Sequence, residues 1–344
     1  MSWILLYMKK CFTTSRFKRF NKSRSDRAIR RKRRHRSRKY NPLRVSNYPP
    51  VKKLPIANVQ APENYSLVYN TIETLQYYNE IRDILASGQR VRFDLSNVKK
   101  MTTDAIAVQI AKIKDERYNK RVPICGNAPK DEKLSNLFQH SGFYEHVRVS
   151  GARPPAKNKL IHERTANRVE PDIAKEACLL GLRHTFKNES IFEPLYDIII
   201  EVMQNTNNHA GKKRGLYDWW LHVYNHPNSA KTIYTFLDLD SGIFNSLPVK
   251  TFWREAANRL HLTSNLDLVD KLFAGEIKSR TSRPERGKGI PQIYECAQDS
   301  VFTTFVLISN DVYADMKKHE SHILSTKFDG TLFYWEIDNN NQNT

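Results

Sequence analysis

The sequence predicts an α/β protein whose folded part begins near residue 54. Helical and strand patterns alternate along residues 63–150, and a second alternation runs from residue 170 towards the C-terminus. With 16 Phe, 16 Tyr and 5 Trp, the chain has the aromatic side chains that a large core needs. Its length of 344 residues suits two domains better than one.

Positive charge is concentrated at the N-terminus. Residues 9–53 contain 19 Lys and Arg and one acid, Asp26, so they carry +18 of the net charge of +20. Such a density of like charge opposes compaction, and we expect residues 1–53 to form a basic flexible arm. The arm is either a solvated tail that aids solubility or a contact for nucleic acid or another polyanion. Five prolines between residues 42 and 62 predict an extended connection after it.

The composition argues against several classes of protein. No apolar run approaches the roughly 20 residues that a transmembrane helix needs, so no transmembrane segment is expected. The apolar opening Met1–Met8 precedes its basic residues, which is the reverse of a signal peptide. Four scattered cysteines without a CxxC pair argue against structural zinc and favour a reducing, cytoplasmic location.

Residues 54–150 are expected to form one compact domain. Apolar periodicity predicts helices at 64–87, 102–113 and 131–140, and strands at 91–95 and 122–125. Gly88 and Gly142 follow two of these helices as stop signals.

A basic, polar linker is expected at residues 151–169, and a second domain at 170–344. The same patterns predict helices at 171–186, 193–210 and 252–273, and strands at 217–224, 232–239, 301–309 and 331–337.

Two segments of the first domain resemble STAS domains, the fold of anti-sigma-factor antagonists. VRFDLSNVKKMTTDAIAVQIAKI (residues 91–113) is similar to the central strand, loop and helix of that fold, and ICGNAPKDEKLSNLFQHSGFYEHV (residues 124–147) to its last strand and helix. The resemblance implies a STAS-like domain at 54–150 that contacts a protein partner. In that family a Ser or Thr at the start of the central helix can be phosphorylated, and Thr103 holds that place. Thr102 could instead simply cap the helix.

The helix IIIEVMQNTNNHA (residues 198–210) has a polar face. Glu201, Asn205 and Asn208 are spaced at i, i+4 and i+7 and therefore share one side of the helix. An amide oxygen is a hard ligand that suits Mg²⁺, and a carboxylate one turn away can orient or deprotonate a water. The solvent-facing side of a surface helix would show the same spacing.

Three later segments add to this pattern. TFLDLDSGI (residues 235–243) is an apolar strand that ends in an Asp and a Gly turn. RGKGIPQI (residues 286–293) is a Gly-rich loop that opens a helix, where backbone N–H groups can hold phosphate. FDGTLFYWEI (residues 328–337) supplies a last strand after a Gly-Thr pair.

In this order, the four segments resemble the nucleotide motifs of the GHKL (Bergerat-fold, histidine-kinase-like) ATPases. The resemblance implies a Bergerat-type α/β sandwich at 170–344, with a mixed sheet and helices on one face. It also implies ATP and Mg²⁺ as ligands. Members of this class often form homodimers, which leaves a homodimer open here.

The resemblance assigns roles to single residues. It makes Glu201 the catalytic general base and gives Asn205 the Mg²⁺. Asp238 matches the Asp that accepts a hydrogen bond from the adenine amino group, and Gly242 matches the second glycine of the same motif. Asp240 stands where that motif usually has its first glycine.

The remaining cofactor-binding residues come from the last two motifs. Gly287 and Gly289 match the phosphate-loop glycines, with Lys288 between them. Gly330 and Thr331 match the final motif, whose Thr contacts the adenine side. The segment between Gly242 and Gly287 would then be the ATP lid.

Together these features predict an ATP-binding regulatory protein whose second domain controls the STAS-like module. Three classes remain open. The first is an ATPase switch that hydrolyses ATP slowly. The second is an anti-sigma-type serine/threonine kinase that acts on Thr102, Thr103 or a partner. The third is a non-hydrolysing nucleotide-sensing interaction protein with a polyanion contact through residues 9–53.

Overall fold

The chain divides into two compact units, Met1–Lys53 and Leu54–Thr344. The computed structural model describes Thr14, Ser15, Arg19 and the ranges 22–27, 56–149, 151–165, 169–209, 217–247, 264–277 and 289–339. Of the first unit, residues 22–27 are helical. No helix in the described parts of the chain has both the length and the apolar character needed to cross a bilayer.

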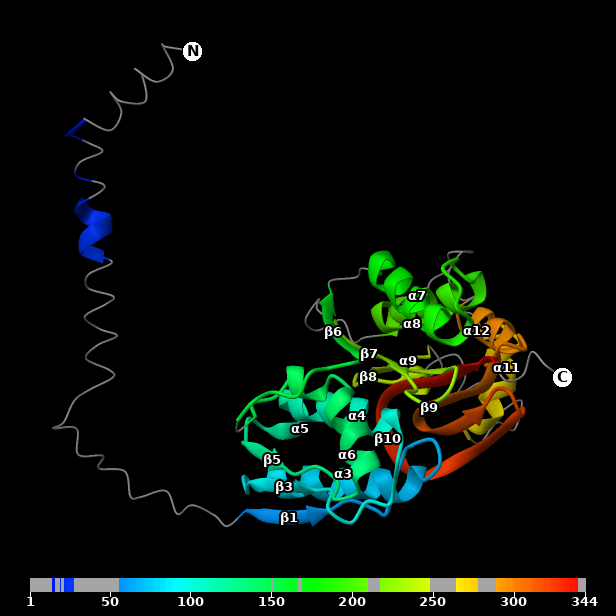
Figure 1. Ribbon diagram of the computed structural model, residues 1–344, viewed down its shortest axis with the longest axis horizontal. Helices are drawn as coiled ribbons and strands as arrows, with labels where there is room; N and C mark the ends of the chain where they lie inside the picture. The colour runs from blue at the N-terminus through cyan, green and yellow to red at the C-terminus, as the bar shows by residue number, and fades with distance from the viewer. Residues whose placement is uncertain are drawn as a thin grey trace, which may run out of the picture. The chain divides into compact units, whose positions relative to one another are not determined.

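The described residues from 56 to 339 form four layers (Figure 1). A three-stranded parallel sheet is followed by helices, then by a five-stranded antiparallel sheet, and then by further helices. The first two layers come from residues 56–149, which we call the N-terminal module.

The parallel sheet of the N-terminal module has the order β1-β3-β5, and a short pair, β2-β4, lies beside it. Its strands are β1 Ala57–Gln60, β2 Asn64–Tyr65, β3 Val91–Asp94, β4 Lys100–Met101 and β5 Ile124–Gly126. Its helices are α3 Thr71–Ala86, α4 Thr103–Lys114, α5 Glu116–Asn119, α6 Glu132–His140 and the 3₁₀ turn η1 Phe143–Glu145.

The first helix begins later than the sequence predicts. Residues 64–70 lie outside α3, because Asn64 and Tyr65 pair with β4. The carboxylate of Asp104 accepts hydrogen bonds from the backbone N–H groups of Leu67, at 2.6 Å, and Val68, at 3.3 Å. These N–H groups are satisfied from a distant part of the chain, so a helical turn has no advantage there. The other predicted elements of the module are confirmed to within two residues at most ends.

The five-stranded sheet has the order β6-β7-β8-β10-β9. Its strands are β6 Lys159–Thr165, β7 Tyr217–Asn225, β8 Lys231–Asp238, β9 Phe302–Asp315 and β10 Glu320–Asp338. All of its pairings are antiparallel, which corrects the expected mixed sheet. The linker expected at 151–169 contains β6, an edge strand whose polar sequence KLIHERT hides its pairing with β7.

The hairpin of β9 and β10 is longer than the predicted strands at 301–309 and 331–337. Its register shifts between Ile323 and Phe328, and again between Phe328 and Thr331. Asn310 and Gly330 have positive φ values of 55° and 133° within these strands. Such residues interrupt the alternating pattern, so the sequence shows only the regular inner half of each strand.

Alternation along the strands gives the sheet two apolar faces. The first face packs against α7 Pro171–Phe186, α8 Glu193–His209 and α12 Gly289–Ala297, and includes Trp219, Leu221, Phe236, Phe333 and Trp335. The second face packs against α3 and α4 of the N-terminal module, and includes Trp220, Leu237, Leu332 and Tyr334. The helices of residues 170–344 thus lie on one face of the sheet, and the N-terminal module covers the other.

The helices of the first face follow the sequence closely. The predicted helix at 171–186 matches the bounds of α7, and α8 ends one residue before the predicted 210. The remaining short helices are α9 Ile243–Ser246, η2 Leu266–Leu268 and α11 Val269–Phe273. The predicted lid helix at 252–273 is seen only in its last part, since residues 248–263 lie outside the described residues.

Candidate functional site

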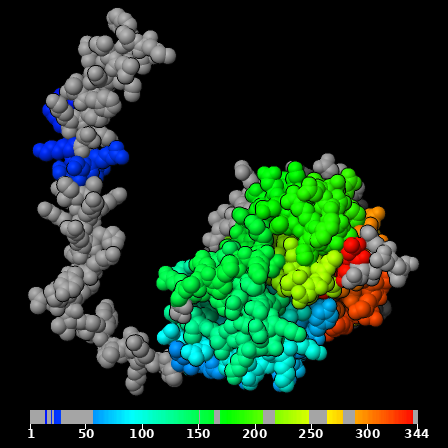
Figure 2. Space-filling model, viewed as in Figure 1, coloured from blue at the N-terminus to red at the C-terminus, as the bar shows by residue number. Residues whose placement is uncertain are grey.

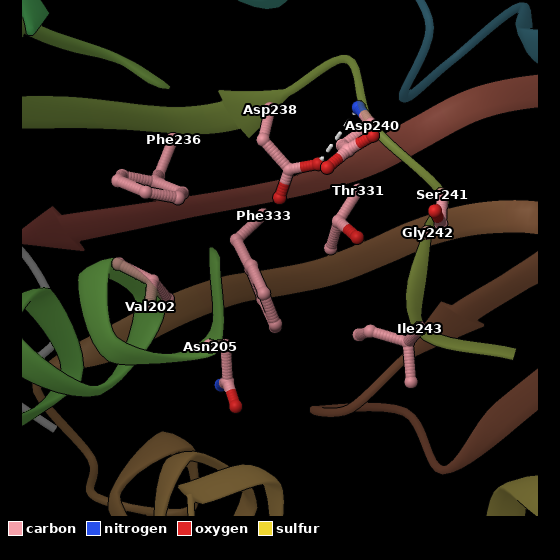
Figure 3. Close-up of a pocket in the computed structure, with 10 residues that line it drawn as sticks. All are labelled: Val202, Asn205, Phe236, Asp238, Asp240, Ser241, Gly242, Ile243, Thr331 and Phe333. Atoms are coloured by element: carbon pink, nitrogen blue, oxygen red, sulfur yellow. Dashed lines mark hydrogen bonds between the residues drawn. The ribbon is translucent and has the colours of Figure 1, made fainter. Parts of the chain in front are cut away.

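The site lies on the first face of the sheet, where β8 ends beside the middle of β10. Asp238 is the last residue of β8, and Thr331 is its cross-strand partner on β10. Both side chains are buried, with 7% and 5% of their surface exposed. They point to the same face as Phe236 and Phe333, the cross-strand pair two residues further along β8 and β10 (Figure 3).

A narrow pocket lies beside these residues. Its lining comes from α8, the end of β8, the turn after it and β10: Val202, Asn205, Phe236, Asp238, Asp240, Ser241, Gly242, Ile243, Thr331 and Phe333. Four of the nine residues predicted for the site, namely Asn205, Asp238, Gly242 and Thr331, thus meet around one pocket. Val202, Phe236, Ile243 and Phe333 form its apolar walls, and Asp238 is buried beside them.

Asp238 is held by two hydrogen bonds. The hydroxyl of Thr206 donates to its Oδ2 at 3.2 Å, and the backbone N–H of Asp240 donates to its Oδ1 at 3.1 Å. Burial raises the pKa of this carboxyl group to about 6. When ionised, it presents a fixed acceptor to a ligand that donates a hydrogen bond.

Two glycines allow the turn after β8 to pack closely against the middle of β10. Gly242 has a φ of 76°, and a Cβ there would lie 2.5 Å from the side-chain Nδ2 of Asn310. Gly330 has a φ of 133°, and its Cβ would lie 2.1 Å from the backbone oxygen of Asp238. Both positions therefore require glycine, for conformation and for space.

Ser309 and Asn310 fix this turn, and the sequence patterns did not single them out. The Ser309 hydroxyl accepts from the N–H of Ile243 at 2.8 Å and donates to the Gly330 carbonyl at 3.0 Å. The Asn310 amide donates to the Ser241 carbonyl at 2.9 Å and accepts from the N–H of Asn245 at 3.1 Å. Two polar residues that interrupt the apolar run of a buried strand were the available signal.

Helix α8 supplies the polar side of the site. The Asn205 side chain is 9% exposed, and its Nδ2 has no hydrogen-bond partner. Glu201 lies one turn earlier and is half-buried. Burial raises the pKa of its carboxyl group, and the nearby Asp197 adds to the shift.

The N-terminus of α12 lies against these two side chains. A Cβ on Gly289 would be 2.8 Å from Oε2 of Glu201 and 3.0 Å from Oδ1 of Asn205. A helix N-terminus offers unpaired N–H groups and positive potential, which favour an anion. The other two residues of this predicted motif, Gly287 and Lys288, lie outside the described residues.

The predicted phosphoacceptor lies elsewhere. Thr103 is 1% exposed, and its hydroxyl has no partner. Its backbone oxygen faces Nδ1 of His222, on the second face of the sheet, at 3.4 Å. Thr102 takes the N-cap position of α4, but its side chain makes no capping hydrogen bond. The five-stranded sheet therefore separates Thr103 from the pocket.

Within the described part of the chain, no group of three or more His, Cys, Asp or Glu could hold a metal ion by itself. No family model matches the chain, and a comparison with curated proteins also gives no match. The geometry of the pocket therefore carries the functional argument.

Proposed function

We propose that residues 170–344 bind Mg-ATP in this pocket, with the adenine against Asp238 and the phosphates towards Glu201, Asn205 and α12. One observation carries the proposal: Asn205, Asp238, Gly242 and Thr331 come from separate segments, yet line a single pocket. Gly289, from a further segment, lies against the polar side chains of α8. This grouping supports the resemblance to the GHKL ATPases, including a Bergerat-type arrangement of residues 170–344.

The buried end of the pocket suits adenine. The Asp238 carboxylate can accept a hydrogen bond from an exocyclic amino group, and the Thr331 hydroxyl lies on the neighbouring strand. Phe236, Ile243 and Phe333 provide apolar surface for the ring. Guanine carries a carbonyl oxygen in place of that amino group, and the carboxylate would repel it.

The polar end suits phosphate and Mg²⁺. The Asn205 amide oxygen is a hard ligand, and Mg²⁺ commonly keeps waters and phosphate oxygens as its other ligands. Mg²⁺ bound there would neutralise phosphate charge. The unpartnered Nδ2 of Asn205 can donate a hydrogen bond to a phosphate oxygen, and Gly289 lets the N-terminus of α12 come close beside it. Glu201, whose pKa is raised by burial, can take the proton from an attacking water.

The placement of Thr103 favours a nucleotide-dependent switch over phosphotransfer within the chain. Thr103 is buried beneath the second face, whereas the pocket opens on the first. In this conformation a phosphoryl group has no path from the pocket to that hydroxyl. We therefore propose that slow hydrolysis changes the state of the second domain, and that the STAS-like module responds while docked beneath the sheet.

Calorimetry of the full chain tests the proposal. We expect Mg-ATP to bind, and Mg-GTP to bind at least about tenfold more weakly, because Asp238 requires an amino donor. Asp238→Asn should abolish this preference, since an amide has one acceptor oxygen and the Asp240 N–H competes for it. The control is Asp329→Asn, at an acid with 66% of its side chain exposed. Equal binding of the two nucleotides by the wild type would refute the proposed base recognition.

A non-hydrolysing nucleotide sensor is the second candidate, and Asp240 favours it. This acid lines the pocket where the resembling family usually has glycine. For such a sensor, Mg-ATP would bind without any release of phosphate above the background of the Glu201→Gln variant.

A role for the basic arm, residues 9–53, is compatible with both candidate functions. We propose that residues 9–53 contact a polyanion such as nucleic acid, because they hold nearly all of the net charge. Binding to DNA or RNA fragments should be indifferent to sequence and fall steeply with salt. Deletion of residues 1–53, which form a separate unit, should remove it.

A further inference from the structure

The N-terminal module reaches the turn that lines the pocket. Arg117 lies on α5, and its Nη2 donates to the backbone oxygen of Leu239. Its Nη1 lies 3.5 Å from Oδ1 of Asp240. In the space-filling view, the blue to green surface of this module packs directly against the green surface of the residues that follow it (Figure 2).

Arg117 is itself held in place. The Asp115 carboxylate accepts from Nε of Arg117 at 3.1 Å, and from the backbone N–H of the same residue at 2.8 Å. One carboxylate thus fixes both the start of α5 and the plane of the guanidinium group. A planar guanidinium group that is oriented in this way can donate hydrogen bonds to two acceptors at once.

Leu239 and Asp240, the two acceptors of Arg117, lie next to Asp238, the residue proposed to recognise the base. Leu239 follows Asp238, and the Asp240 N–H donates to Oδ1 of Asp238 at 3.1 Å. A continuous series of hydrogen bonds therefore runs from Asp115 through Arg117 and Asp240 to the buried carboxylate. Asp240 is also the residue that departs from the glycine of the resembling motif, and its side chain is turned to this arginine.

We propose that Arg117 is a positioning residue for the nucleotide pocket, so that docking of the N-terminal module and binding of adenine are coupled. The inference rests on the proposed function and adds its regulation. A module docked beneath the sheet holds the Asp238–Gly242 turn in its binding conformation. By thermodynamic linkage, a bound adenine must stabilise the docked module by the same factor.

The expected effect is moderate. The Arg117 and Asp240 side chains are 61% and 32% exposed, and solvent weakens such an ion pair. The effect comes mainly from orientation of the Leu239 carbonyl and the following turn. We expect Arg117→Ala to weaken binding of adenosine and ATP by about three- to tenfold, in line with the loss of a charge-assisted hydrogen bond.

Calorimetry with three probes separates positioning from general destabilisation. Arg117→Ala should weaken adenosine and Mg-ATP alike, and leave binding of Mg-pyrophosphate, which has no base, unchanged. Arg117→Lys should restore part of the loss, because an ammonium group can still reach the Leu239 carbonyl. Arg121→Ala is the matched control: Arg121 is 82% exposed, two residues beyond α5, and its ion pair is with Glu116.

Amide hydrogen exchange of the nucleotide-free protein gives an independent readout. Arg117→Ala should speed exchange at the N–H of Asp240, and Arg121→Ala should not. If the wild type binds no ATP, the proposed function fails and exchange alone decides whether Arg117 holds the turn. If the wild type binds ATP and Arg117→Ala binds adenosine equally well, the coupling is refuted and the proposed function stands.

Discussion

The two faces of the five-stranded sheet are built from the same strands, but it is the first face that leaves a pocket. Both carry rows of buried aromatic and aliphatic side chains, and both bury polar groups. On the second face, His222 is buried beneath the N-terminal module, and Thr103 of that module lies buried against it. On the first face, the apolar rows stop at Asp238 and Thr331 and leave a pocket. Burial of polar side chains alone therefore does not mark a site, whereas an opening lined from several segments does.

The largest difference between the faces should appear in catalysis. Glu201→Gln removes the proposed general base on the first face without changing the shape of the side chain. Phosphate release should fall about a hundredfold or more, and the Kd for Mg-ATP should stay within about threefold of the wild type. Glu193→Gln, at an exposed acid in the first turn of the same helix, is the control. Equal loss in both variants, or no loss in either, would contradict the role of Glu201.

A substitution at Gly330, where β10 packs against the backbone of Asp238, should lower the stability of the protein. Gly330→Ala places a Cβ 2.1 Å from the Asp238 oxygen at a φ of 133°. We expect the free energy of unfolding to fall by about 2–4 kcal/mol in urea titrations. Gly88→Ala is the comparison, because Gly88 has a φ of 82° and no atoms within 4 Å of its Cβ position. Its cost should be about 1 kcal/mol, from strain alone. Similar losses at the two positions would argue against the close fit at Gly330.

The second face should respond to acid. Burial lowers the pKa of His222 to about 4, from a normal value of 6.5. The unfolded chain therefore takes up a proton first, and stability is lost as the pH falls from about 6.5 towards 4. Between pH 7 and pH 5 this histidine should cost on the order of 2 kcal/mol.

Urea titrations of wild type and His222→Gln at the two pH values measure this contribution. The comparison of variants matters because the raised pKa values of Asp104 and Asp238 act in the opposite direction. The wild type should lose more stability than His222→Gln, and His319→Gln, at an exposed histidine, should behave like the wild type. Parallel losses in wild type and His222→Gln would show that His222 does not titrate in this range.

The pH response of the first face should appear in binding. The pKa of Asp238 is raised to about 6, and its ionised form is the acceptor for the base. Affinity for adenosine, whose ring titrates far below this range, should rise about tenfold as the pH rises from 5 to 7.5. The Asp238→Asn variant should show a flat profile. A flat profile in the wild type would remove Asp238 from base recognition.

Much of this architecture could be predicted from the sequence because its signals are local. Helices α7 and α8 have apolar periodicity and, in α7, a proline in the first turn, so both were placed closely. Strands β7 and β8 are rich in aromatic and branched aliphatic residues and flank a turn-rich segment. In contrast, β6 is a polar edge strand and β2 has two residues, and only their partners define them.

Several residues that line the pocket could be predicted from the sequence, but the residues that hold them in place could not. Asn205, Asp238, Gly242 and Thr331 could be identified because short motifs in a fixed order carry them. Thr206, Ser309, Asn310 and Arg117 act through tertiary hydrogen bonds, and Arg117 reaches Leu239 from 122 residues away. No periodicity or motif encodes a contact of that kind. For the same reason, the sequence did not predict that the N-terminal module packs against the second face of the sheet.

The measurement that tests the central claim most directly is calorimetric titration of the full chain with ATP, with and without Mg²⁺, in wild type and Asn205→Ala. If the first face holds a magnesium–nucleotide site, the wild type binds ATP more tightly with Mg²⁺, and Asn205→Ala loses that gain. If the wild type shows no binding at millimolar ATP, or if Asn205→Ala keeps the full effect of Mg²⁺, the pocket is not the site described here.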